Sequence, residues 1–188
     1  MSSKRIVDLL LALAAAAVLA VPVLLIALLV RLTSTGPILF WSDRVGRYNA
    51  IFRMPKFRSM RVDTPAVATH LLQNPDQFLT SIGGFLRKSS LDELPQLWSI
   101  ICGDMSFVGP RPALFNQDDL VAQRTEVGVD ALVPGLTGWA QINGRDELPI
   151  PQKVALDAEY LRRQSFGFDL KILFMTFLKV VRRDNVTH

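Results

Sequence analysis

An uninterrupted apolar run of 22 residues, Leu9–Val30, constrains this chain more than any other feature of its sequence. As an α-helix the run is about 33 Å long, close to the thickness of the hydrocarbon core of a bilayer. Lys4 and Arg5 precede it, and Arg31 follows it. A cleaved signal peptide also starts with basic residues, but its apolar region is only about 7–15 residues long and ends at a small-residue cleavage site. We therefore expect residues 1–35 to be inserted into a membrane.

The path of this segment depends on Pro22, which lies near its middle. A proline inside a helix removes one backbone hydrogen bond and bends the helix. Basic residues occur on both sides of the run, and basic residues favour the cytoplasmic side of a membrane. This pattern suits a re-entrant helical hairpin, kinked at Pro22, with both ends cytoplasmic. An ordinary kinked span fits the same residues.

The composition excludes several classes of protein. Of the 188 residues, 49% are hydrophobic and 20% are charged, which excludes intrinsic disorder. The single cysteine, Cys102, excludes an internal disulfide framework, and the only histidines are His70 and His188. Any metal site would therefore use carboxylates, which favour a hard cation such as Mg²⁺. The net charge of +4 suits an anionic partner such as a nucleotide phosphate or an anionic lipid.

Residues 36–188 have the pattern of a second, catalytic domain that is mostly α-helical with one small β-hairpin. The break at residues 33–37 separates it from the membrane segment. Two short, aromatic-rich segments, 38–41 and 51–54, flank Gly46 and Asn49 and predict the hairpin. We expect helices over 78–101 (interrupted at Gly83-Gly84 and Pro95), 116–127, 152–163 and 169–183, and loops over 62–77, 103–112 and 134–145.

The last predicted helix, residues 169–183, is amphipathic. At about 100° per residue, Lys171, Lys179, Arg182 and Arg183 share one sector, and most of the apolar residues share the opposite one. One interpretation is a helix that buries its apolar face in the core and exposes its basic face to solvent. The other is an interfacial helix in the headgroup layer of the membrane.

Two adjacent carboxylates, Asp92 and Glu93, are candidates for chemistry. Adjacent residues of a helix point about 100° apart, so one could face a substrate while the other faces a metal. A purely structural interpretation is also available. Ser90 and Glu93 have the spacing of a capping box, which would make both acids ordinary first-turn residues of a helix.

Several basic residues are candidates for binding phosphate. Arg111 lies between Pro110 and Pro112, which restrict the backbone around it, and a pre-ordered guanidinium binds phosphate through two parallel hydrogen bonds. A rigid surface loop is the alternative explanation. Further candidates are Lys56, Arg58 and Arg87, together with Gln141 and Arg145 of the glycine-rich stretch 134–145.

The order of these motifs resembles one known family. The apolar segment is followed by KFRSM (56–60), RKSSLDELPQL (87–97), GDMSFVGPRP (103–112), PGLTGWAQINGR (134–145) and LDAEY (156–160). The chain is similar along nearly its whole length to the bacterial sugar transferases, the small monotopic phosphoglycosyl transferases. The DELPQL and VGPRP strings are specific to that family.

The resemblance implies an activity. Members of the family move a phosphosugar from a UDP-sugar to a polyprenol phosphate in the membrane and release UMP. By this resemblance Asp92 is the nucleophile, which forms a covalent phosphosugar intermediate, and Glu93, with Asp92 beside it, binds Mg²⁺. The implied substrate-binding residues are Arg111, Arg87, Lys56, Arg58, Asp157, Tyr160, Gln141 and Arg145.

The resemblance also implies a location: the cytoplasmic face of the bacterial inner membrane. The bilayer is then a partner, nucleic acid is not, and a homodimer is left open. Two rivals remain at this point. One is a membrane-anchored basic adaptor that binds anionic lipid or nucleic acid without catalysis. The other is an enzyme of the same substrate class in which polyprenol phosphate attacks the donor directly.

Overall fold

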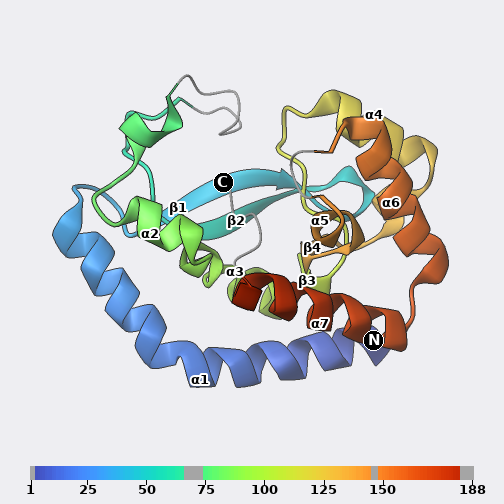
Figure 1. The fold of residues 1–188 in the computed structure, drawn as a ribbon, viewed down its shortest axis with the longest axis horizontal. Coiled ribbons are helices and arrows are strands. Elements are labelled where there is room, and N and C mark those ends of the chain that lie inside the picture. The colour runs from blue at the N-terminus through green and yellow to red at the C-terminus, as the bar shows by residue number, and fades with distance from the viewer. Residues whose placement is uncertain (1–2, 66–73, 145–147, 183–188) are drawn as a thin grey trace.

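A long N-terminal helix runs along one side of the molecule, and the other elements all lie to one side of it (Figure 1). The computed structural model describes residues 3–65, 74–144 and 148–182. The helices and strands are, in order, α1 (Ser3–Thr33), β1 (Leu39–Val45), β2 (Ile51–Phe57), α2 (Gly83–Lys88), α3 (Gln96–Cys102), β3 (Ser106–Val108), α4 (Asp118–Glu126), β4 (Gly135–Thr137), α5 (Trp139–Ile142), α6 (Ile150–Arg163) and α7 (Phe166–Arg182). Short 3-10 helices lie at Arg47–Asn49, Pro75–Phe78, Leu91–Glu93 and Val129–Ala131. The fold is therefore mostly helical, as the sequence predicts.

Helix α1 is long and apolar enough to cross a membrane. Its central part is apolar all round, but packing on the rest of the protein buries only a few of its residues. Its buried residues are Asp8, Ala12, Ile26 and Val30. Figure 1 shows the helix changing direction along its length, and Pro22 lies inside it. The structure does not confirm a hairpin with two separate arms, because α1 is one continuous helix.

Both ends of α1 contact the part of the protein that follows this helix, residues 34–182, which we call the lobe. Near the start of the helix, the Lys4 ammonium donates to the Asp169 carboxylate at the start of α7 at 2.6 Å. Arg5 donates to the carbonyl oxygens of Ile100 and, at 2.7 Å, Ile101, which lie in the last turn of α3. The Gly103 amide also donates to the Ile100 carbonyl, at 3.2 Å, so Arg5 adds side-chain donors to this end of α3 and serves as a cap.

The far end of α1 packs on the β-hairpin and on α2. Ile26 and Val30 form a buried cluster with Phe57 and Leu86. This contact and the contacts of Lys4 and Arg5 therefore join both ends of α1 to the same lobe.

The predicted β-hairpin is confirmed. Strands β1 and β2 pair antiparallel, from Leu39 opposite Phe57 to Val45 opposite Ile51. Both strands extend beyond the predicted residues. In the turn between them, Tyr48 and Asn49 have positive φ angles of 53° and 60°. Asparagine tolerates this left-handed region better than most residues.

The predicted helical segment 78–101 is broken, but the first break lies elsewhere than expected. Gly83-Gly84 begins α2 rather than interrupting it, and the chain turns after α2 at Ser90, whose φ is 56°. Gly83 is required by packing, because a Cβ atom there would lie 1.9 Å from the carbonyl oxygen of Ser59. Pro95 directly precedes α3, as a helix-starting proline commonly does.

The structure corrects two predicted loops. Residues 103–112 contain β3 and residues 134–145 contain β4 and α5, and the two strands pair in parallel. The backbones approach so closely that a Cβ atom on Gly135 would lie 2.1 Å from the amide nitrogen of Gly109. The glycines in these stretches therefore serve backbone packing, and the small parallel sheet fixes the loop that carries Arg111.

Helix α7 exposes its apolar side. Phe174 and Phe177 are 61% and 63% exposed, and Leu170 is 50% exposed, whereas Ile172 is fully buried. The interpretation of a helix that buries its apolar sector in the core is therefore wrong. Figure 1 shows α7 beside the N-terminal half of α1, and both helices carry exposed apolar residues.

Candidate active site

Asp92 lies in the 3-10 helix Leu91–Glu93, between α2 and α3, and is only 6% exposed. Burial is the largest influence on this carboxyl group and raises its pKa. The nearby cations Lys56 and Arg87 act in the opposite direction, toward the charged form. Its Oδ1 atom is buried without a hydrogen-bond partner among the described residues. A buried oxygen in this state suits a group that meets its partner only when a ligand binds.

The structure does not support the capping-box interpretation of Asp92 and Glu93. Ser90 precedes the 3-10 helix in a left-handed conformation, and its side chain makes no capping hydrogen bond. The turn is instead held by backbone bonds, such as that from the Glu93 amide to the Ser90 carbonyl at 3.2 Å.

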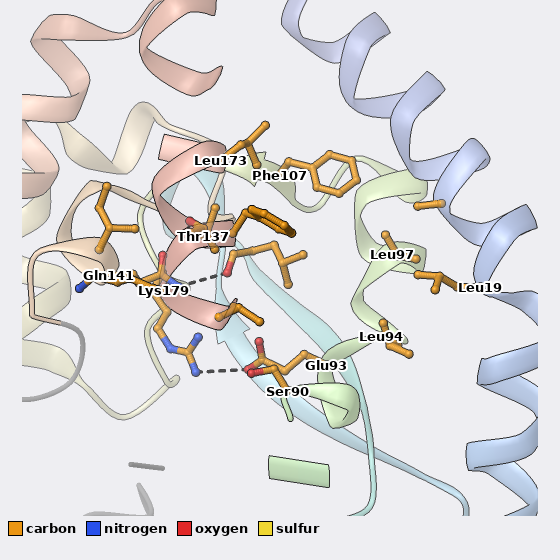
Figure 2. Close-up of a pocket in the computed structure, with 17 residues that line it drawn as sticks. Leu19, Ser90, Glu93, Leu94, Leu97, Phe107, Thr137, Gln141, Leu173 and Lys179 are labelled. Atoms are coloured by element: carbon orange, nitrogen blue, oxygen red, sulfur yellow. Dashed lines mark hydrogen bonds and ion pairs between the residues drawn. The ribbon is translucent and has the colours of Figure 1, made fainter. Parts of the chain in front are cut away.

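Glu93 forms ion pairs with two of the predicted phosphate-binding residues. Lys56 of β2 donates from Nζ to Glu93 Oε1 at 2.8 Å, and Nη2 of Arg111 lies 3.4 Å from the same oxygen. Three residues predicted from three separate motifs thus meet at one point. Figure 2 shows the ion pair between Glu93 and the arginine as one of its dashed lines. An anionic substrate at this point would find two cations already in place.

Of the other predicted cations, Arg87 lies near Asp92 and Arg58 does not. Arg87 of α2 lies close enough to influence Asp92 and donates from Nη1 to the sulfur of Met60 at 3.0 Å. Arg58 is not brought into the site. It is buried and donates to the carbonyl and hydroxyl oxygens of Ser34 at 2.9 and 2.7 Å. Burial lowers the pKa of Arg58, and its contacts fix the junction that follows α1.

Asp157 lies behind the Arg111 loop and is 1% exposed. Its Oδ2 atom accepts from Nε and Nη2 of Arg124 at 3.0 and 2.6 Å, and Nη1 of Arg124 donates to the backbone carbonyl of Arg111 at 2.9 Å. Burial raises the pKa of Asp157, and the guanidinium opposes that effect. Asp157 is therefore a positioning residue in this structure, placed to hold Arg111 rather than to contact a substrate.

Tyr160 also supports the segment that carries Arg111. Its hydroxyl donates to Asp169 at 2.7 Å and lies 3.2 Å from the carbonyl oxygen of Val108, at the end of β3. Burial and the neighbouring Asp169 raise its pKa, so it stays a neutral donor. Tyr160 thus supports the Val108–Pro112 segment at its start.

Arg124 is the residue that sequence reasoning missed. It is 8% exposed although it belongs to a polar helix, α4. Nothing in its spacing distinguishes it from its neighbours, and only the fold reveals its partner.

A cavity of about 400 Å³ adjoins Glu93 and Arg111, between α1, α3 and α7. Most of its walls are apolar. Figure 2 shows Leu19, Leu94, Leu97, Phe107 and Leu173 around it, with Gln141 and Lys179 at another side. Gln141 donates from its amide nitrogen to the Leu136 carbonyl at 3.1 Å, and its Oε1 atom has no partner among the described residues. The last candidate, Arg145, lies outside the described residues.

The acidic residues fit a metal ion that is shared with a substrate. The described part of the chain has no group of three or more His, Cys, Asp or Glu side chains that could hold a metal alone. Mg²⁺ is commonly bound by one or two carboxylates together with substrate phosphates. Glu93 and the unpartnered Oδ1 atom of Asp92 suit such a shared site.

With this geometry established, comparison with known proteins identifies the family. The profile of the bacterial sugar transferases matches residues 1–183. The chain belongs to the bacterial sugar transferase family. Its buried acid, its cation pair and its apolar N-terminal helix are thus features of a bacterial sugar transferase.

Three relatives illustrate the match. A UDP-glucose:undecaprenyl-phosphate glucose-1-phosphate transferase of Escherichia coli is 43% identical over 162 residues, which are 82% of this chain and 35% of that protein. An undecaprenyl-phosphate galactose phosphotransferase of Salmonella typhimurium is 36% identical over 79% of this chain and 34% of its own length. An uncharacterized sugar transferase of Bacillus subtilis, EpsL, is 38% identical over 97% of this chain and 89% of its own length. This sugar transferase chain therefore spans about a third of the first two relatives and most of the third.

The Arg124–Asp157 pair provides a test of the positioning role. Arg124→Met leaves Asp157 buried without its partner, and breaking a buried pair in this way costs about 3–5 kcal/mol. The double variant Arg124→Met/Asp157→Leu removes the unpaired charge, so we expect thermal stability to recover. We expect activity to stay low, because the Arg111 carbonyl has lost its donor.

The matched control is Arg61→Met, which breaks an exposed pair with Asp63 and should change neither property. Full activity in the double variant would show that Arg124 serves stability alone.

Proposed function

We propose that this sugar transferase moves a phosphosugar from a UDP-sugar to a polyprenol phosphate of the undecaprenyl type, with release of UMP. The observation that carries the proposal is one site that combines a buried carboxylate, two cations on Glu93 and an apolar cavity walled by α1. A diphosphate needs the cations, and a lipid needs the apolar walls. The names of the relatives from E. coli and Salmonella support undecaprenyl phosphate as acceptor and a hexose as the sugar. The product would begin the assembly of a polysaccharide or another glycoconjugate on its lipid carrier.

The proposed chemistry has two steps. A carboxylate oxygen of Asp92 forms a bond to the phosphorus that carries the sugar, and the bond from that phosphorus to the bridging oxygen breaks. The electron pair stays on the bridging oxygen, and UMP leaves. A phosphate oxygen of the acceptor then attacks the same phosphorus and displaces Asp92. A carboxylate needs no general base for such an attack.

The chain's own residues would support both steps electrostatically. Arg111 and Lys56 lie where they can take the negative charge of the diphosphate, and Arg87 favours the ionised form of Asp92. We propose Glu93 and Asp92 as the residues that hold Mg²⁺ with the substrate. When bound, Mg²⁺ would neutralise phosphate charge.

We further propose that α1 enters the cytoplasmic leaflet of the bacterial inner membrane and leaves it on the same side, bent at Pro22. Its two ends contact one lobe, and Lys4, Arg5 and Asp8 all bind groups of that lobe. A spanning helix would place one end about 30 Å from the other across the bilayer. The exposed apolar side of α7 would then lie at the same interface, and residues 36–188 would form the cytoplasmic catalytic domain.

The adaptor hypothesis accounts for less of the structure. Binding to anionic lipid or nucleic acid needs exposed cations, yet Lys56 and Arg111 are directed to Glu93 beside a buried Asp92. Burying a carboxyl group is costly, and a binding module gains nothing from it.

Release of UMP tests the proposed function. We expect the purified protein with Mg²⁺ and undecaprenyl phosphate to release UMP from one or more members of a UDP-glucose, UDP-galactose and N-acetylated UDP-sugar panel. Asp92→Asn should abolish turnover while the protein stays folded, because an amide does not attack phosphorus at useful rates. Asn49→Asp, a change on the exposed hairpin turn, is the control and should keep full activity. An absence of UMP release with every donor would contradict the proposal.

Topology can be tested with single cysteines at positions 3 and 35, in a background in which the exposed Cys102 is replaced by serine. We expect both cysteines to resist an impermeant maleimide in intact cells and to react after permeabilisation. Reaction of position 3 alone from outside the cell would establish a true span.

A further inference from the structure

One cation of the cavity is not used by the proposed donor chemistry. Lys179, near the end of α7, lines the cavity together with Glu93 and Arg111 and is half-buried. Lys56 and Arg87, the cations near Asp92, do not line the cavity. Glu93 and Arg111 therefore adjoin both places, and Lys179 belongs to the cavity alone.

Lys179 has no hydrogen bond or ion pair with any residue that the structure describes, whereas Arg111 and Lys56 are paired with Glu93. Two other polar side chains of the cavity, those of Thr137 and Thr176, are occupied within the protein, whereas the Oε1 atom of Gln141 has no partner among the described residues. Thr137 and Thr176 bond each other at 2.8 Å, and Thr176 also donates to the Ile172 carbonyl. A lysine left unpaired in a mostly apolar cavity suits an anionic ligand, because burial of an uncompensated charge is unfavourable.

The apolar part of the cavity indicates which kind of molecule the anionic group belongs to. Its rim includes Ala15 and Leu19 of α1, and Phe177 and Val180 of α7 are 63% and 48% exposed. Apolar surface therefore continues from the outside of the two helices into the cavity. A ligand with a hydrocarbon chain can enter this way without exposing the chain to water, and its charged end then meets Lys179.

We propose that Lys179 binds the phosphate of the lipid acceptor and that the cavity between α1, α3 and α7 holds the first part of its hydrocarbon chain. This inference rests on the proposed function. It divides the cations of the site, with Lys56 and Arg87 on the donor side, Lys179 on the acceptor side, and Arg111 between them. Lys179 is thus a residue that sets the affinity for one substrate and not for the other.

The test is a split in Michaelis constants. Lys179→Gln keeps most of the side-chain length and removes the charge, so we expect the KM for undecaprenyl phosphate to rise roughly tenfold to a hundredfold. The KM for the UDP-sugar should stay within about twofold. Lys179→Arg should restore most of the affinity, since it returns the charge. Equal changes in both constants, or no change in either, would overturn the inference.

Lys171→Gln is the matched control. It removes the same charge from the same helix, but Lys171 lies over the ring of Trp139 and does not line the cavity. Both variants are assayed in nanodiscs with and without anionic phosphatidylglycerol, because a phospholipid headgroup could also attract Lys179. If Lys171→Gln shows the same defect, or if anionic lipid alone sets the size of the defect, Lys179 contacts the bilayer surface and the inference is wrong.

Different results would contradict the proposed function and the role of Lys179. If the wild-type protein releases no UMP with any donor, the proposed function is wrong and the acceptor site with it. If the wild type is active and Lys179→Gln keeps a normal KM for undecaprenyl phosphate, only the assignment of Lys179 fails.

Discussion

Three charged side chains near the start of α1 tie this mostly apolar helix to the lobe, and the remaining structure depends on these contacts. Lys4 pairs with Asp169, Arg5 caps α3, and Asp8 accepts a hydrogen bond from the Phe107 amide at 3.2 Å. Each of these charges has its partner in the lobe, so α1 and the elements that follow it pack as one body. The wall of the cavity that α1 supplies exists only in this arrangement.

These contacts continue to the loop that carries Arg111. Asp169, which holds Lys4, also accepts from Tyr160, and Tyr160 contacts the backbone at Val108. From the other side, Arg124 holds the backbone of Arg111. The loop is therefore fixed through its main chain, and the guanidinium of Arg111 is directed to Glu93. Fixing a cation in this way lowers the reorganisation needed when a phosphate binds.

The sequence alone was sufficient for features that depend on local pattern. The apolar helix follows from its length and hydropathy, and the β-hairpin follows from two β-prone segments around a turn. The meeting of Lys56, Glu93 and Arg111 followed from family motifs, since spacing along the chain says nothing of contacts between distant segments. Strands β3 and β4 could not be predicted, because three-residue strands in a Gly- and Pro-rich context have no periodicity to detect. Arg124 was not singled out in the sequence and Arg58 was predicted to bind substrate, and only the tertiary structure shows that both are buried.

The central claim is that Asp92, buried near Lys56 and Arg87, is the nucleophile of a two-step transfer. The most direct measurement is the intact mass of the protein after incubation with its UDP-sugar and Mg²⁺ in the absence of polyprenol phosphate. The account predicts a gain of one phosphosugar, with release of UMP, and a modified peptide that contains Asp92. The adduct should disappear when polyprenol phosphate is added. If UMP appears only in the presence of polyprenol phosphate and no adduct forms, the acceptor attacks the donor directly and Asp92 is not the nucleophile.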